Sequence, residues 1–165
     1  MEYMNDKMKK IKDTVINDLS YAKKTELSSL EKVISPNIVK IDDCFILDLE
    51  NELSNTQSIN WDRILKMYGD KTGYEASCNE LRVNDCLDNE NLSEDEVLIY
   101  AFHVMDGWEH QLNESFPEHK FILILTVDEG YATLRFYKFR EEESSWLNED
   151  IEKNGEAVLV REINH

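Results

Sequence analysis

Residues 120–139 read KFILILTVDEGYATLRFYKF, and this stretch decides the class of the fold. Lys120 to Val127 is a continuous run of residues that favour β-strands. Tyr131 to Phe139 alternates apolar with polar side chains, as a half-buried strand does. Asp128-Glu129-Gly130 separates the two runs, and its glycine suits a left-handed turn position. The stretch therefore predicts an antiparallel β-hairpin.

A helix is predicted before this hairpin and a strand after it. Ser93 stands three residues before Glu96 at the start of an apolar run, which is the pattern of a capping box. The helix that it opens ends before Phe116-Pro117 and is expected to bury Val97, Ala101, Val104, Met105, Trp108 and Leu112. Glu156 to Ile163 predicts the last strand, after a loop or short helix that holds Trp146 and Leu147.

The first half of the chain predicts mainly helix. Apolar residues recur at three- and four-residue steps from Met1 to Ile34, and Ser35-Pro36 then ends the pattern. Asn37 to Ile41 is a short β-branched run. Cys44 to Leu53 fits either a strand or a short helix, and we prefer the helix. Asn60 is expected to cap a helix that buries Trp61, Ile64, Leu65 and Tyr68.

The chain is predicted to form one α+β domain over residues 1–165. It consists of a long N-terminal helix over 1–34, a helical middle over 44–115 and C-terminal antiparallel strands over 119–163. Because a run of helices precedes a run of strands, we expect an antiparallel sheet of about three to four strands with helices packed on one face.

The composition of the 165 residues excludes several classes of protein. The chain has 35 acidic and 18 basic residues, a formal net charge of −17 and a pI near 4.5. This balance argues against direct binding to nucleic acid or to an anionic membrane. No apolar run reaches the roughly 20 residues of a membrane span, and residues 1–10 lack a signal peptide's apolar segment. Three cysteines without a CxxC pair fit a reducing compartment, so we expect a cytoplasmic protein with small buried thiols.

The negative charge is unevenly distributed along the chain. Residues 1–40 carry a balance of +2, so residues 41–165 carry −19. Between Val83 and His119 there are ten acidic residues and no lysine or arginine. A surface built from this stretch is expected to attract a basic partner and to speed its association.

The sequence has no catalytic motif that assigns a reaction. GxSxG, HExxH and phosphate-binding loops are missing, and no cofactor, metal or catalytic residue is predicted. His103 and His110 lie seven residues apart on the predicted helix, with Asp106 between them. An alternative hypothesis is therefore a small enzyme that uses these three residues as a metal or acid–base site.

The last third of the chain resembles a known kind of protein. It combines the strand Tyr131 to Lys138, the acidic run Glu141 to Glu143, Ser145-Trp146-Leu147, Asp150-Ile151-Glu152 and the apolar run Ala157 to Val160. This arrangement is similar to small acidic bacterial immunity proteins of polymorphic or contact-dependent toxin systems. The resemblance implies a stoichiometric inhibitor that binds a cognate toxin domain, often a basic nuclease, and needs no catalytic residues.

Charge and resemblance together predict a binding protein that neutralises a basic toxin domain. The acidic surface from Asp85 to Glu118 is its expected contact, with an exposed tryptophan as an anchor. The predicted partner-binding residues are Asp85, Asp88, Glu90, Glu94, Asp95, Glu96, Asp106, Glu109 and Trp146. A further alternative is an acidic mimic of DNA that inhibits a nucleic-acid-binding protein.

Overall fold

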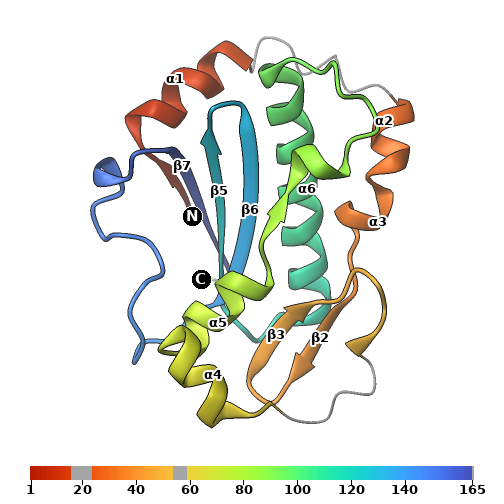
Figure 1. Cartoon of the computed structure of the whole chain (residues 1–165). Coiled ribbons are helices and arrows are strands. Elements are labelled where there is room, and N and C mark those ends of the chain that lie inside the picture. The colour runs from red at the N-terminus through yellow and green to blue at the C-terminus, as the bar shows by residue number, and fades with distance from the viewer. Residues whose placement is uncertain (16–23, 54–58, 165) are drawn as a thin grey trace.

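The computed structural model describes residues 1–15, 24–53 and 59–164 (Figure 1). Its regular elements are, in chain order, β1 (Glu2–Met4), α1 (Asp6–Val15), α2 (Lys24–Ser29), α3 (Glu31–Ile34), β2 (Ile38–Ile41), β3 (Cys44–Leu47), α4 (Trp61–Tyr68), α5 (Lys71–Cys78), β4 (Leu81–Arg82), the 3-10 turn η3 (Val83–Cys86), α6 (Glu94–Ser115), β5 (Phe121–Asp128), β6 (Tyr131–Lys138), the 3-10 turn η4 (Ile151–Lys153) and β7 (Ala157–Ile163).

The strands form two antiparallel sheets. The larger sheet has five strands in the order β1-β7-β5-β6-β4, and β2 pairs with β3 in a separate two-stranded sheet. The predicted α+β class with an antiparallel sheet is confirmed. The larger sheet exceeds the predicted three to four strands because its two edges, β1 and β4, are only three and two residues long. Such short edges carry little pattern of their own.

The predicted hairpin is the centre of the larger sheet. β5 and β6 pair over their full length, from Phe121 opposite Lys138 to Asp128 opposite Tyr131. Glu129 and Gly130 form the two-residue turn, with φ values of 48° and 80°. Both residues are left-handed, which matches the twist of two adjoining antiparallel strands.

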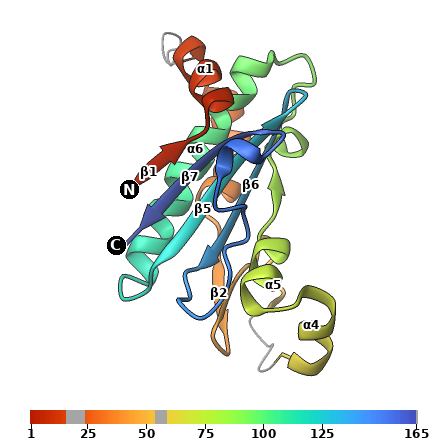
Figure 2. The same cartoon turned by 90° about the vertical axis from the view of Figure 1, so that its left-hand side faces the viewer.

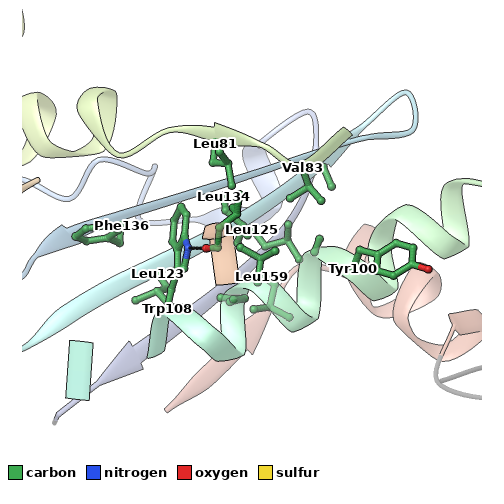
Figure 3. Packing of buried hydrophobic residues seen from close by; sticks show 14 of the residues in the cluster. Leu81, Val83, Tyr100, Trp108, Leu123, Leu125, Leu134, Phe136 and Leu159 are labelled. Carbon is green, nitrogen blue, oxygen red and sulfur yellow. Dashed lines mark hydrogen bonds between the residues drawn. The ribbon is translucent and has the colours of Figure 1, made fainter. Parts of the chain in front are cut away.

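One face of the larger sheet packs against α6, as predicted. The capping box at Ser93 and Glu96 is present, and all six apolar positions that the sequence predicted to be buried lie in the core. Trp108 packs its ring edge-on against Phe136 and donates its Nε1 hydrogen to the carbonyl of Val33 at 2.8 Å (Figure 3). Although α6 has 22 residues, neither it nor another helix in the described ranges is apolar enough to cross a membrane.

The second face of the larger sheet is covered by α5 and by part of the segment between β6 and β7. Ala76 of α5 and Leu147 pack on a cluster formed by Ile122, Ile124, Tyr137, Val158 and Val160. Figure 2 shows α5 on the side of the sheet away from α6. The prediction of helices on one face therefore describes α6 and α1, while α5 is an addition on the other face.

The prediction of one helix over residues 1–34 is wrong. Residues 2–4 form β1, in which Tyr3 pairs with Val160 of β7. The buried side chain of Asn5 then starts α1, because its Oδ1 accepts hydrogen bonds from the amides of Met8 and Val158 at 3.0 and 2.9 Å. Pairing with a strand more than 150 residues away overrides the helical spacing. Residues 16–23, which include two of the periodic positions, lie outside the described part of the chain.

The preferred helix at Cys44 to Leu53 is also wrong, and so is a wholly helical middle over 44–115. Cys44–Leu47 forms β3, which pairs with β2 from Ile41 opposite Cys44 to Ile38 opposite Leu47. Asp42, with φ of 52°, provides the turn between them. The strand alternative is the better one because the β-branched run before the turn offers a partner within hairpin distance.

The helix capped by Asn60 is confirmed, but its predicted buried face is not. The Asn60 side chain accepts a hydrogen bond from the Arg63 amide at 3.3 Å. None of the α4 residues is fully buried, and Leu65 is 44% exposed. The rings of Trp61 and Tyr68 instead lie against Tyr74 of α5. An amphipathic pattern predicted the helix correctly, but α4 lies at the margin of the core.

Two polar side chains of α5 attach the β2–β3 sheet to the larger one. Glu75 is fully buried and accepts hydrogen bonds from the amides of Phe45 and Lys138 at 2.7 and 2.8 Å. It also accepts from both terminal nitrogens of Arg140, at 2.9 and 3.0 Å. Asn79, one turn later, donates to the carbonyls of Phe45 and Phe136. The two sheets are therefore joined through helix side chains and not through strand pairing.

Glu75→Ala tests this connection. The change leaves the buried guanidinium of Arg140 without its main counter-charge, so we expect the free energy of unfolding to fall by roughly 3–5 kcal/mol in urea titrations. Glu50→Ala is the control, because Glu50 forms an exposed ion pair with Lys32. That variant is expected to lose less than about 1 kcal/mol. Equal losses in the two variants would contradict a structural role for the buried pair.

The crossing of α6 with α3 depends on a glycine. A Cβ at Gly107 would lie 2.2 Å from the carbonyl oxygen of Ile34, which is backbone and cannot rotate away. Gly107→Ala is expected to lower the free energy of unfolding by about 1–3 kcal/mol through overpacking, although alanine favours a helix. Gly155→Ala is the matched change, since nothing lies within 4 Å of its Cβ. Thermal unfolding should separate the two variants, and a stabilised Gly107→Ala protein would refute the close approach.

Candidate functional site

The acidic loop and the β5–β6 turn surround one open depression. Its volume is about 530 Å³. Four carboxylates line it, from Asp85, Glu90, Glu94 and Glu129, and no basic side chain of the described residues does. Its apolar lining comes from Leu87, Leu92, Val97 and the ring of Tyr131. The depression therefore combines a strongly negative potential with apolar surface, which are the two features that a cationic side chain with an apolar stem can use.

The β5–β6 turn holds this depression in shape. The Asn84 side chain donates to the carbonyl of Gly130 at 3.0 Å and accepts from the amide of Ala132 at 2.9 Å. Glu94 lies directly over the turn, since a Cβ at Gly130 would be 2.8 Å from its Oε1. The turn, η3 and the start of α6 are therefore fixed against one another before any partner binds.

The described structure brings only part of the predicted acidic set together. Asp85, Glu90 and Glu94 line the depression, and Asp88 and Asp95 are exposed close to it in the chain. None of these five forms an ion pair with another residue of the described ranges. Glu96 turns back to Ser93, whose hydroxyl lies 3.2 Å from Glu96 Oε1. The segment from Asp85 to Asp95 thus carries five acidic side chains without an ion pair in the described ranges, the last two of them in the first turn of α6.

Asp106 and Glu109 belong to a different surface. Both accept hydrogen bonds from Nη1 of Arg161, at 2.7 and 2.8 Å, while Glu2 accepts from Nη2 of the same arginine at 2.9 Å. Arg161 lies on β7, far along the chain from α6. One guanidinium therefore compensates part of the charge of these two carboxylates and holds them on a surface apart from the Asp85 to Asp95 segment, despite their proximity to it in sequence.

Trp146, the predicted aromatic contact, lines a second depression next to the acidic one. Its ring is 37% exposed and lies under the guanidinium of Arg135, 4.4 Å from the ring centroid. A second depression of about 400 Å³ is lined by Trp146 and shares Glu129 and Tyr131 with the first. Tyr131 is 49% exposed, and the guanidinium of Arg82 lies over its ring, 4.8 Å from the ring centroid. The two depressions form one surface around Tyr131, which we call the turn surface.

The sequence reasoning missed the centre of the turn surface. Tyr131 was expected only to begin a strand, and Arg82 and Arg135 were given no role. The alternation along β6 carried a usable signal, because it places Tyr131, Thr133 and Arg135 on the face opposite the apolar core. Charge counts along the chain do not detect such a surface, because its residues come from four separate segments.

The alternative histidine site lacks a free central carboxylate. Asp106 Oδ1, which stands between His103 and His110 in sequence, is bonded to Arg161. His110 is exposed and His103 is half-buried. Within residues 1–15, 24–53 and 59–164, no group of three or more histidine, cysteine or acidic side chains is placed to hold a metal ion.

The cysteines are free thiols with suppressed ionisation. Burial, together with the nearby Glu75 carboxylate, raises the pKa of the Cys44 thiol to about 12. Burial also raises the pKa of Cys78 and of Cys86, which are partly buried. Because the thiolate is the reactive form, all three are expected to be poor nucleophiles near neutral pH.

Thiol labelling tests the environment of Cys44. At pH 8 the folded protein is expected to leave Cys44 unlabelled by a disulfide reagent, while urea exposes three reactive thiols. In folded Cys44→Ala, the rate at which the other two thiols, Cys78 and Cys86, are labelled should equal their rate in the natural chain. In urea, the number of reactive thiols should fall from three to two. A fast-reacting native thiol that disappears in Cys44→Ala would contradict the raised pKa.

Comparison with known proteins places the chain among bacterial relatives. It is 24% identical over 132 residues to Uncharacterized protein PM0498 of Pasteurella multocida (strain Pm70), and the alignment covers 78% of this chain and 80% of that protein. No solved structure shows significant similarity to it. Since residues 3–165 match the model of this family, the chain belongs to the Uncharacterized protein PM0498 family.

Proposed function

We propose that this chain is a cytoplasmic immunity-type protein that binds a basic toxin domain and occludes its active surface without catalysis. The observation that carries the proposal is the depression that, in the part of the chain that the structure describes, is lined by four carboxylates, by no basic residue and by the exposed Tyr131. The C-terminal third, whose pattern resembles acidic immunity proteins, supplies both Tyr131 and Trp146 to the same surface.

Electrostatics supports a cationic partner. A net charge of −17 produces a negative field around the whole protein, and the loop from Asp85 to Asp95 concentrates carboxylates that no ion pair within the described ranges neutralises. Such a surface raises the rate of encounter with a basic protein and disfavours acidic ones. Binding also needs apolar contacts, because charge alone contributes more to rate than to affinity.

The aromatic residues of the turn surface suit these apolar contacts. Tyrosine and tryptophan are enriched among the residues that dominate binding energy. Tyr131 and Trp146 are exposed, and each is held in place by an arginine stacked on its ring. Arg135 is itself anchored by Glu80 at 2.5 Å. The rings therefore lose little conformational entropy when a partner covers them.

The products of the genes that flank this one supply the test. We expect one of them to be toxic when expressed alone in bacteria and harmless when this chain is co-expressed. The purified pair should associate at least about tenfold more slowly at high than at low ionic strength, because salt screens the attraction. An Asp85→Asn, Glu90→Gln, Glu94→Gln triple variant should associate about three- to tenfold more slowly than the natural chain.

A matched variant separates the site from the total charge. Glu114→Gln, Glu141→Gln and Glu142→Gln remove three exposed acids that do not line the turn surface. We expect this control to associate nearly as fast as the natural chain. No toxic neighbour that this chain neutralises, or equal slowing in both triple variants, would overturn the proposal.

A further inference from the structure

A separate cavity lies at the other end of the sheet's second face. It has a volume of about 280 Å³, which suits a molecule of amino-acid size. Its floor includes Ile122, Tyr137 and Val160 of the sheet, and its outer wall is formed by residues 143–151 of the segment between β6 and β7. Figure 2 shows that segment running along this side of the sheet. The turn surface uses the opposite end of β5, near Thr126 and Asp128.

Aromatic rings make up much of the cavity. Tyr3 of β1, Tyr137 of β6 and Phe139 all line it. Tyr137 is buried, and its hydroxyl lies 3.3 Å from the hydroxyl of Ser145. Tyr3 and Phe139 are partly exposed, which places accessible rings at the mouth. The faces of aromatic rings carry negative potential and attract cations that lie within about 6 Å.

The charged groups around the cavity are predominantly negative. Glu143, Glu149 and Glu162 line it, and Arg140 is the one basic residue of the described ranges that does. The Arg140 guanidinium is already held by two hydrogen bonds to Glu75, with Asp43 3.5 Å from its Nε. Glu75 and Asp43, which lie outside the cavity lining, compensate part of the positive charge of Arg140, while three carboxylates and one guanidinium line the cavity itself.

The wall of the cavity is held in place without a ligand. Glu143 accepts a hydrogen bond from the Thr72 amide at 2.7 Å, which ties the start of the segment to α5. Leu147 packs on the apolar cluster of the sheet, and its neighbour Trp146 turns to the turn surface. The segment thus crosses the sheet between two hollows, and residues 143–145, 147–149 and 151 line the cavity.

We propose that this cavity binds a small organic ammonium cation. Aromatic faces next to carboxylates are the chemistry that recognises such cations, because the rings accept their apolar surface while the acids compensate their charge. An apolar floor beneath an acidic rim disfavours anions and offers little to a strongly hydrated metal ion. This inference rests on residues outside the turn surface, so it stands or fails independently of the proposed toxin partner.

Choline and its neutral carbon isostere, 3,3-dimethylbutan-1-ol, provide the test. They have nearly the same shape and differ in charge. In NMR titrations of the full chain we expect choline to shift the amide resonances of Tyr137, Ser145 and Leu147 in a saturable manner. The isostere should bind at least about threefold more weakly, because it lacks the cation–π attraction. Equal affinities, shifts confined to other residues, or no saturable shift with choline would overturn the proposal.

Two substitutions locate the binding energy. Glu149→Gln removes an exposed carboxylate of the rim and is expected to weaken choline binding about threefold. Phe139→Leu removes a ring at the mouth and should weaken it by a similar factor. Glu142→Gln changes the net charge by the same amount, but Glu142 does not line the cavity. The affinity of this variant for choline should therefore match that of the natural chain. The same loss in Glu142→Gln and Glu149→Gln would refute a defined site.

Discussion

The buried carboxylate of Glu75 is the interaction on which the arrangement of this protein depends. It accepts hydrogen bonds from β3, from the end of β6 and from both terminal nitrogens of Arg140. Removing a charge from water is costly unless excellent geometry compensates it, and this geometry satisfies the carboxylate completely. Burial nevertheless raises the pKa of Glu75 above its usual value, so its ionised form depends on Arg140 remaining in place. The Glu75–Arg140 pair therefore holds α5 and the β2–β3 sheet in one position relative to the larger sheet.

That position determines what remains available on the second face of the sheet. α5 covers the face near β6, and the segment between β6 and β7 crosses the rest with Leu147 on the sheet. Among the described residues, one hollow lies on each side of this crossing. On the face packed against α6, Trp108 and its neighbours are fully buried and form the main apolar core. Both proposed sites consequently involve the second face or the turn at its end.

The accuracy of the sequence predictions depended on how local each signal was. The β5–β6 hairpin and the capped helix α6 were predicted correctly because the turn glycine and the capping box act within a few residues. β1 was predicted as helix because its partner, β7, lies at the other end of the chain. Asp85, Glu90 and Glu94 line one depression, whereas Arg161 binds Asp106 and Glu109 on another surface. Counting charges along the sequence does not show that Arg161 of β7 contacts these two residues of α6.

By itself, the sequence determined the class of the fold, the central hairpin, the covering helix and the strongly negative charge of the region after residue 40. Periodicity, turn chemistry and composition are properties of neighbouring residues, so they can be read along the chain. Only the tertiary structure decided which acids form ion pairs, that Tyr131 and Trp146 line one depression and how the 280 Å³ cavity forms. The physical reason is that ion pairs, strand edges and cavities arise from residues that folding brings together across long sequence separations.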